Sequence, residues 1–232
     1  MIYFTSDFHF NHTQILEYEP RRKEVLGTTI AEHDENLIKR INSRAREHDT
    51  LIIVGDLGLS KFSDIKACVD KLVCRHKIMV LGNHDKLSYG QTNRLGFSWV
   101  CYETKLKIAG EYVRICHHPY RKPWYKCIFP WQYKEKDRNK RPIDTGNFLI
   151  HGHIHSGGHR DGAWRVFKRM INVGVDVSNY YPVSLNEIAD LITKTKAKKT
   201  KFQKILDYLS FLCGKFAVSN IIDKETRKCV KS

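Results

Sequence analysis

The feature that most constrains the fold is a short apolar run that recurs along most of the chain, with helical patterns between its copies. Each run is three to five residues long and apolar on both faces, as expected of a strand buried inside a sheet. Strands that alternate with helices predict βαβ units arranged around a largely central sheet. The expected strands are Ile2–Ser6, Leu51–Val54, Ile78–Leu81, Val113–Cys116, Phe148–Ile150 and Ile171–Val173.

Three helices are expected beside these strands. The first spans Thr29–Glu47 and has an apolar face on which His33 lies. Ser63 is the expected N-cap of the second, whose apolar residues recur at helical spacing from Ile65 to Val73. The sequence Ser184-Leu-Asn-Glu187 is a capping box that predicts the start of the third.

Polar clusters follow five of the expected strands. A strand end is a rigid position from which a side chain can point at the rim of a sheet. The side chains are Asp, His and Asn, which offer oxygen and nitrogen ligands, and no cysteine is among them. That set suits borderline first-row ions such as Mn, Fe, Zn or Ni. The clusters are Asp7-Phe-His9, Gly55-Asp56, Gly82-Asn83-His84-Asp85, His117-His118 and Gly152-His153-Ile154-His155.

Taken singly, each cluster has an ordinary structural explanation. An isolated histidine such as His9 or His117 is more often a hydrogen-bonded core residue than a metal ligand. Asp7 and Asp56 alone could be turn residues after strands. Gly-Asp occurs widely, whereas Gly-Asn-His-Asp and Gly-His-x-His are rarer. The five clusters in this order are therefore specific, although no single one is.

In this order the clusters resemble the motifs of the calcineurin-like metallophosphoesterase superfamily, over roughly residues 1–183. The compact length and the early sequence Asp7-Phe-His9-Phe-Asn-His12 are similar to small prokaryotic or phage members. The resemblance implies a four-layer α/β/β/α sandwich, two sheets flanked by helices, with a dinuclear metal site at the carboxyl ends of the strands. Periodicity alone predicts only an α/β fold.

The resemblance also implies which residues hold two divalent metal ions (Mn, Fe, Zn or Ni). The first ion would take Asp7, His9, Asp56 and His155. The second would take Asp56, Asn83, His153 and His117, with His118 as the alternative to His117. Asp56 would bridge the two, because a carboxylate has two oxygens and can serve two cations at once.

Two ions ~3.5–4 Å apart can share a hydroxide that attacks phosphorus in line with the leaving oxygen. In the family, a histidine at the position of His84 faces the leaving group, and Asp85 is expected to orient the His84 ring through a ring nitrogen. Substrate contacts are expected from His12, His118, Arg121 and Trp124. Three further histidines, His33, His48 and His76, are expected at the surface.

The function that the resemblance implies is a metal-dependent hydrolase of phosphate esters, and a phosphodiesterase acting on a nucleotide or nucleic acid is favoured. A phosphomonoesterase is the near alternative. A non-catalytic nucleic-acid- or protein-binding module on the same fold should lack ligands or the leaving-group histidine, and none is missing here. Ser/Thr protein phosphatases usually follow Gly-Asp with Asp-Arg-Gly, whereas Gly55-Asp56-Leu57-Gly58 lacks the arginine, which disfavours that branch.

Charge indicates the kind of partner. Lys and Arg outnumber Asp and Glu 40 to 25, a formal net charge of +15. Such a field attracts polyanions, of which nucleic acid is the commonest. Residues 120–142 form a basic and aromatic insertion whose prolines argue against a long helix. From Lys194 onward, 11 Lys and Arg stand against 3 Asp and Glu, a net charge of +8.

We therefore expect a metallophosphoesterase domain over residues 1–193, followed over residues 194–232 by a lysine-rich linker and an amphipathic helix with Phe202 and Leu209 on its apolar stripe. Attachment to nucleic acid through this tail, with catalysis secondary, is a further alternative. Seven scattered cysteines without a CxxC pair indicate reduced thiols. Neither a signal peptide nor an apolar run of ~18–20 residues is expected, which favours a cytoplasmic chain with no membrane partner.

Overall fold

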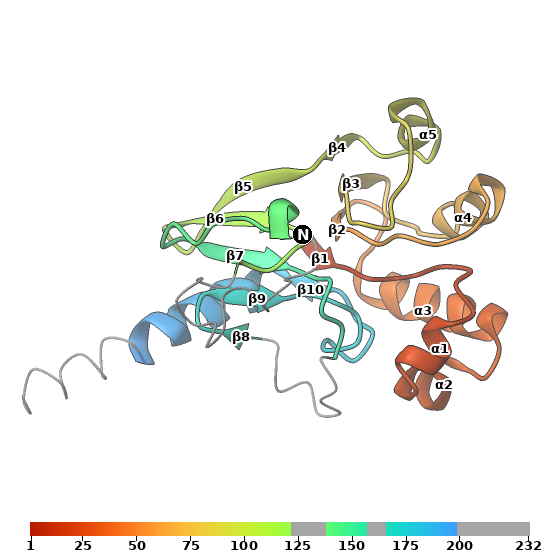
Figure 1. The fold of residues 1–232 in the computed structure, drawn as a ribbon, viewed down its shortest axis with the longest axis horizontal. Coiled ribbons are helices and arrows are strands. Elements are labelled where there is room, and N and C mark those ends of the chain that lie inside the picture. The colour runs from red at the N-terminus through yellow and green to blue at the C-terminus, as the bar shows by residue number, and fades with distance from the viewer. Residues whose placement is uncertain (122–137, 157–165, 199–232) are drawn as a thin grey trace, which may run out of the picture. The chain divides into compact units, whose positions relative to one another are not determined.

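A computed structural model describes residues 1–121, 138–156 and 166–198 (Figure 1). Most of the basic insertion, Trp124 included, and the expected C-terminal helix therefore lie outside the described residues. Met1–Leu191 form one compact unit, and Ile192–Ser232 belong to a second, of which residues 192–198 are described and helical. No helix in the described part of the chain is both long and apolar enough to cross a membrane.

The first sheet has five strands in the order β10-β1-β2-β3-β4. β1 to β4 run parallel, and β10 pairs with β1 in the antiparallel sense. Ile53, in β2, lies between Thr5 and Met79 in this register. The strands are β1 (Ile2–Thr5), β2 (Thr50–Val54), β3 (His76–Val80), β4 (Trp99–Cys101) and β10 (Val183–Ser184).

The second sheet also has five strands, in the order β5-β6-β7-β9-β8. Its three inner strands, β6, β7 and β9, are parallel, so their carboxyl ends lie at one edge. Ser6, directly after β1, pairs with Gly174, two residues beyond β9, so the ends of the two sheets meet. The strands are β5 (Glu103–Ile108), β6 (Glu111–Cys116), β7 (Phe148–His151), β8 (Val166–Phe167) and β9 (Met170–Asn172).

Helices cover the first sheet on the side away from the second sheet (Figure 1). Leu37 and Ile41 of α3 share one buried cluster with Leu51 and Ile53 of β2. Because side chains alternate along a strand, Ile52 and Val54 face the other side, toward the second sheet. The helices are α1 (Ile15–Tyr18), α2 (Arg21–Leu26), α3 (Ile30–Arg44), α4 (Phe62–Val69) and α5 (Tyr89–Arg94), with a short 3-10 helix at Arg138–Lys140.

Helix starts follow the capping chemistry of the sequence in three places, one of them Ser88 and Gln91 at the start of α5. Thr29 caps α3, its side chain accepting from the Glu32 backbone while Glu32 bonds back. Ser184 and Glu187 make the same reciprocal pair before the helix that begins at residue 185. The start expected for α4 was wrong by two residues: Lys61 is its N-cap.

Two sheets in a mixed α/β arrangement agree with the expected sandwich. The six expected strands are all present, and their limits differ from the prediction by two residues at most. The described cysteines, 68, 74, 101 and 116, are free thiols. Parallel strands that end at one rim place the loops after β1, β2, β3, β6 and β7 close together.

Candidate metal centre

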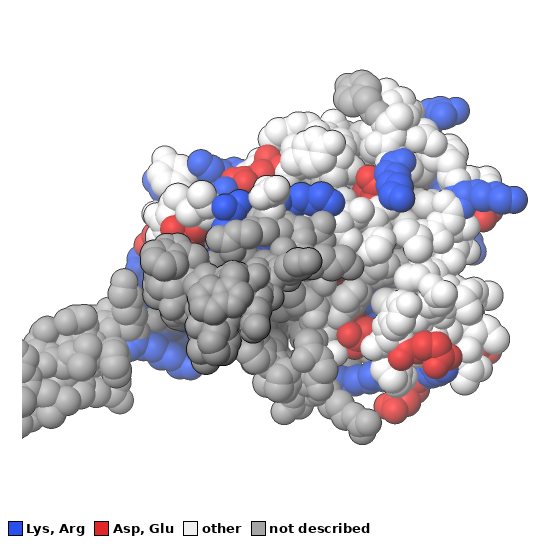
Figure 2. All heavy atoms as spheres, in the orientation of Figure 1, with Lys and Arg blue, Asp and Glu red and all other residues white. Residues whose placement is uncertain are grey.

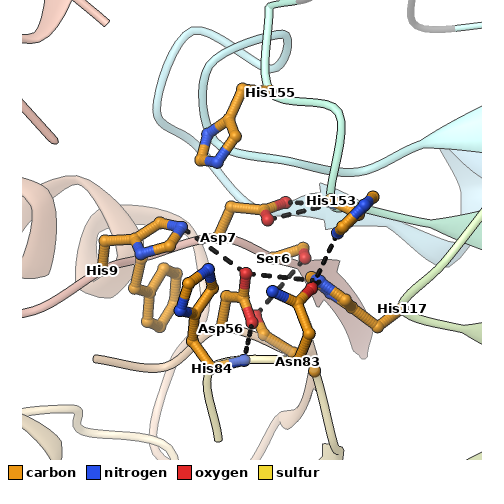
Figure 3. Close-up of polar contacts among 12 residues, drawn as sticks. Ser6, Asp7, His9, Asp56, Asn83, His84, His117, His153 and His155 are labelled. Atoms are coloured by element: carbon orange, nitrogen blue, oxygen red, sulfur yellow. Dashed lines mark hydrogen bonds and ion pairs between the residues drawn. The ribbon is translucent and has the colours of Figure 1, made fainter. Parts of the chain in front are cut away.

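Seven predicted metal-ligating side chains converge where these loops meet (Figure 3). The loop after β1 supplies Asp7 and His9, and the loop after β2 supplies Asp56. Asn83 follows β3, His117 follows β6, and His153 and His155 follow β7. The sequence separates these residues by as much as 148 positions, so the topology of the two sheets assembles the group.

The backbone at this group is held in a conformation that non-glycine residues rarely adopt. A positive φ brings a side chain close to its own backbone and costs about 1–3 kcal/mol for each residue. Such positions persist only where the surrounding structure enforces them, and they gather at functional sites. The residues with positive φ are Asp7 (61°), His9 (54°), Asp56 (54°), His153 (71°) and His155 (47°).

Asp7, His9 and His155 form the first triad, whose ligand atoms lie within 4.8 Å of one another. Both ring nitrogens of His9 are buried, and neither has a hydrogen-bond partner among the described residues. Burial, and then the charge of His155, lower the pKa of His9 to about 2, so the ring is neutral. Burial raises the pKa of Asp7 above its ordinary value. A cation bound here would meet the unpaired nitrogen and stabilise the buried carboxylate.

Asp56, His117 and His153 form the second triad, also within 4.8 Å. His117 uses Nδ1 to bond the Val54 carbonyl at 2.7 Å, which leaves Nε2 facing the centre. The Asn83 Oδ1 atom lies 3.1 Å from His117 Nε2 and 2.8 Å from His153 Nδ1. Asn83 therefore adds a fourth donor to this triad.

The charges in the second triad are coupled. Burial opposes a charged His117, but its contact with Asp56 prevails and raises the pKa of His117 to about 9. Burial also opposes a charged Asp56, yet its bonds with His117 hold the pKa of Asp56 below its ordinary value. Burial and the charge of His117 lower the pKa of His153 to about 3. A cation would take the place of the His117 proton.

One carboxylate faces both triads. Asp56 Oδ2 lies 3.3 Å from Nε2 of His117 and 3.7 Å from Nε2 of His9. Its other oxygen accepts the His84 backbone N–H at 3.0 Å. Figure 3 shows Asp56 between the rings of the two triads.

The role expected for Asp85 differs from its observed contacts. Its Oδ2 atom accepts the N–H groups of Asp56 (2.8 Å) and Gly82 (2.7 Å), and its Oδ1 accepts that of Leu57 (2.9 Å). Among the described hydrogen bonds, none joins it to the His84 ring, which instead lies with its centroid 5.6 Å from that of His9. In the described structure Asp85 therefore holds the backbone of the Asp56 loop.

Two glycines permit the close approach of these loops. A Cβ on Gly82 would lie 2.3 Å from Asp56 Oδ1. A Cβ on Gly152 would lie 2.0 Å from Ser6 Oγ and 2.4 Å from Asp7 Oδ2. Real Cβ contacts are longer than either distance, so any larger residue would displace the carboxylates.

The residues expected to touch substrate differ in their placement. The ring centroid of His12 lies 5.4 Å from that of His9, and that of His118 lies 4.6 Å from that of His153. His117, rather than His118, belongs to the second triad. The backbone N–H of Arg121 bonds the Pro142 carbonyl. His12 and His118 thus lie beside the two triads, whereas the hydrogen bond that Arg121 makes within the described residues joins it to Pro142.

Sequence reasoning missed two residues that support the first triad. Arg22 and Asp176 form a buried ion pair behind it. Asp176 lies three residues after the last expected strand, Ile171–Val173. It is a polar residue beyond a strand end, like the five clusters, and could have been recognised from the sequence on that ground. Arg22 is one of 40 basic residues, and nothing in the sequence distinguishes it. The expected surface position of His33 was wrong: it is fully buried, and its place on the apolar face of α3 was the better indicator.

A third group, Glu19, His155 and Asp176, also has ligand atoms within 4.8 Å of one another. Both oxygens of Asp176 already accept hydrogen bonds from Arg22, however. The first two triads are therefore the better candidates for metal ions. Their oxygen and imidazole donors, and the unpartnered nitrogens of His9, fit divalent first-row cations.

Comparisons with known proteins agree with this geometry. A family model described as calcineurin-like phosphoesterase matches residues 1–194. An uncharacterised protein of Methanocaldococcus jannaschii is 30% identical over 201 residues, covering 86% of this chain and 95% of that protein. The gene 66 protein of Mycobacterium phage L5 is 28% identical over 207 residues, covering 82% and 93%.

The fold recurs in a solved structure. A protein of unknown function from Aquifex aeolicus aligns with a TM-score of 0.60 at 24% identity, covering 82% of this chain and 98% of that one. The family match spans both sheets and every residue of the two triads. The chain therefore belongs to the calcineurin-like phosphoesterase family, whose members are metal-dependent hydrolases of phosphate esters.

Proposed function

We propose that the chain is a dinuclear phosphodiesterase that cleaves a nucleotide or nucleic acid. The position of Asp56 carries this proposal, because one of its oxygens lies within 4 Å of ring nitrogens from both triads. A carboxylate in this position can serve two neighbouring cations at once. Two separate triads, each with its own histidines, support one ion at each.

The first ion would be held by Asp7, His9, His155 and Asp56, and the second by Asp56, Asn83, His117 and His153. Divalent cations there would stabilise charge on the phosphoryl oxygens and make a hydroxide nucleophile available at neutral pH. The protein itself fixes the donors. Asp7 accepts the His153 backbone N–H at 3.0 Å, which ties the loop after β1 to the loop after β7.

His84 is suited to act on the leaving group. Its backbone N–H is used to hold Asp56, so the imidazole is left at the edge of the centre beside His9. His84 is half-buried, so part of the residue is exposed to solvent. From this position it would donate a proton to, or stabilise charge on, the departing oxygen.

Two features of the sequence support a nucleotide or nucleic acid as substrate. The net charge of +15 favours polyanions. The basic and aromatic insertion begins at Tyr120, three residues after the second-triad ligand His117. Its aromatic residues are of the type that stack on bases, and its basic residues are of the type that meet phosphates.

A metal-by-substrate screen tests the proposal. Purified protein would be assayed with Mn²⁺, Fe²⁺, Zn²⁺ and Ni²⁺ on bis-p-nitrophenyl phosphate, p-nitrophenyl phosphate, cyclic nucleotides, and single-stranded DNA and RNA. We expect metal-dependent turnover that EDTA abolishes, faster on diesters than on the monoester. Faster turnover of the monoester would identify a phosphomonoesterase instead. Binding of two ions with no turnover of any substrate would contradict an enzymatic function.

A further inference from the structure

We propose that Arg22 is a positioning residue that holds the first triad together, so that its loss weakens the first metal site and spares the second. The inference rests on the proposed two-metal site. In the described part of the chain, no hydrogen bond joins the guanidinium of Arg22 to a ligand side chain. Arg22 acts through the backbone of the loop after β1 and through Asp176.

Arg22 is fully buried, and its guanidinium fixes the loop that carries Asp7 and His9. Nη2 donates to the Asp7 carbonyl at 2.8 Å, and Nη1 donates to the Phe8 carbonyl at 3.0 Å. Asp7 and His9 both have positive φ, so these carbonyls flank a backbone segment under strain. A donor at each carbonyl stabilises the turn that directs both ligand side chains toward the centre.

The same guanidinium fixes His155 through Asp176. Nε and Nη2 bond the two oxygens of Asp176, each at 2.7 Å. Asp176 Oδ2 in turn accepts a hydrogen bond from His155 Nδ1 at 2.8 Å. With Nδ1 occupied, His155 has Nε2 left to face Asp7 and His9. One side chain therefore positions all three members of the first triad, although they come from two different sheets.

Helix α3 braces Arg22 from the other side. Nη1 of Arg22 lies 3.2 Å from His33 Nε2, and His33 Nδ1 lies 2.8 Å from Asp34 Oδ1. Because an arginine can only donate, His33 Nε2 must accept and its Nδ1 must carry the proton. The other oxygen of Asp34 accepts the backbone N–H of Asn11 at 2.9 Å. The chain of bonds thus runs from His155 through Arg22 to Asn11, behind the whole loop after β1.

The second triad is held mainly by other groups. His117 is fixed by the Val54 carbonyl, and the Asp56 loop is fixed by Asp85. Two bonds join it to the first triad, from the His153 N–H to Asp7 and from the His9 N–H to the Asp56 carbonyl. None of the described hydrogen bonds of the second triad or of Asn83 involves Arg22. A guanidinium offers five donors in a planar fork, whereas a lysine offers a single charged centre. Lysine at this position would keep the charge beside Asp176 but could not hold both carbonyls and the carboxylate.

The variants Arg22→Lys and Asp176→Asn test the proposal, with Arg21→Met as the matched control from the same helix. Arg21 is only partly buried, and its side chain bonds Asn179 at 3.3 Å, away from the triads. Thermal unfolding of the metal-free proteins would show that each variant folds. Mn²⁺ titration by calorimetry and the absorption spectrum of bound Co²⁺ would report the sites without recourse to activity.

We expect two ions per chain in the wild type and in the control. In folded Arg22→Lys one ion should bind as before and the other roughly 10–100-fold more weakly, the usual effect of losing a residue that orients a ligand. Combined with His117→Ala, Arg22→Lys should weaken the remaining ion. Combined with His155→Ala, it should not.

Two ions of unchanged affinity in Arg22→Lys, or equal weakening in both combinations, would overturn the role of Arg22. A wild-type protein that binds fewer than two ions would instead contradict the proposed function, whatever the variants do. The two failures are therefore distinguishable.

Discussion

At the scale of single residues, His84 separates metal binding from chemistry. Its backbone N–H holds Asp56 at 3.0 Å, while its ring lies beside His9 and is no part of either triad. His84→Ala keeps the backbone bond and removes only the ring. The metal content should therefore stay at the wild-type value while turnover falls by about 10²–10⁴-fold, the usual contribution of a positioned acid.

The role of proton transfer is tested by comparing the turnover of His84→Ala with that of the wild type on a series of esters with increasingly good leaving groups. Good leaving groups need no proton, so the loss of rate in His84→Ala should shrink along the series. An equal loss across the series would show that the ring acts by electrostatics alone. Loss of metal together with activity would show that His84 is a ligand.

Asp85 makes a second prediction at this scale. Its oxygens hold the backbone of Asp56, Leu57 and Gly82, so it fixes the loop that carries the Asp56 carboxylate. Asp85→Ala should lower the affinity for both ions, because Asp56 is expected to serve both. Calorimetric titration would measure it, with Asp64→Ala, a partly exposed aspartate of α4, as the control. A normal affinity for both ions would contradict the positioning role.

Single residues also mark the limits of prediction from this sequence. The seven ligand candidates were found because each belongs to a short motif after a strand. Asp85 belongs to such a motif too, yet its contacts differ from those expected, since the direction of a side chain on a turn depends on backbone angles. Arg22 belongs to no recognisable motif. Its contacts with the loop after β1 depend on how α2 packs, so they could not be predicted from the sequence.

At the scale of elements, the buried strands were predictable and the loops and edges were not. The six expected strands are apolar on both faces because they are covered on both sides. β5, an edge strand with exposed Glu103, Lys105 and Lys107 alternating with more buried residues, has no such continuous apolar run and was missed. α4 ends at Val69, so Val73 of the expected stripe is 46% exposed. Periodicity detects burial, and it fails where an element is short or half-covered.

The loop after β3 provides the prediction at this scale. Gly82→Ala would place a Cβ 2.3 Å from Asp56 Oδ1, and the carboxylate must move. Gly90→Ala is the matched control, because a Cβ there meets nothing within 4 Å. We expect Gly82→Ala to lose metal affinity and activity by at least about tenfold while it keeps its fold.

The two glycine variants would be compared by circular dichroism, which reports the fold, and by metal titration, which reports the affinity for the ions. If Gly82→Ala binds both ions as the wild type does, the contact between this loop and Asp56 is not what sets the geometry of the centre. Impairment of Gly90→Ala to the same degree would mean that the effect is general to the chain and not specific to the loop.

At the scale of the whole molecule, the distribution of basic residues is expected to decide how strongly a polyanionic substrate binds. Figure 2 shows lysine and arginine side chains spread over the described part of one face, with acidic residues among them. The segment from Lys194 onward carries a net +8 of the total +15. Both triads lie within residues 7–155, far along the chain from that segment.

Removal of Lys194–Ser232 therefore should leave turnover of a small ester unchanged and weaken binding to single-stranded nucleic acid. The dependence of binding on salt should also flatten, because fewer counterions are released. Small-ester turnover, thermal unfolding and binding at two salt concentrations would be compared with the full chain. A truncated protein that melts lower and loses every activity would mean that the segment stabilises the fold. One that is stable, active and binds nucleic acid as before would contradict the expected role of the charge.

The most direct test of the two-metal centre is a crystal structure of the protein grown with Mn²⁺, with anomalous scattering used to locate the ions. The geometry predicts two anomalous peaks about 3.5–4 Å apart. One peak should lie among Asp7, His9 and His155, the other among Asn83, His117 and His153, with Asp56 contacting both. A single peak, or two peaks without a shared contact to Asp56, would contradict the account.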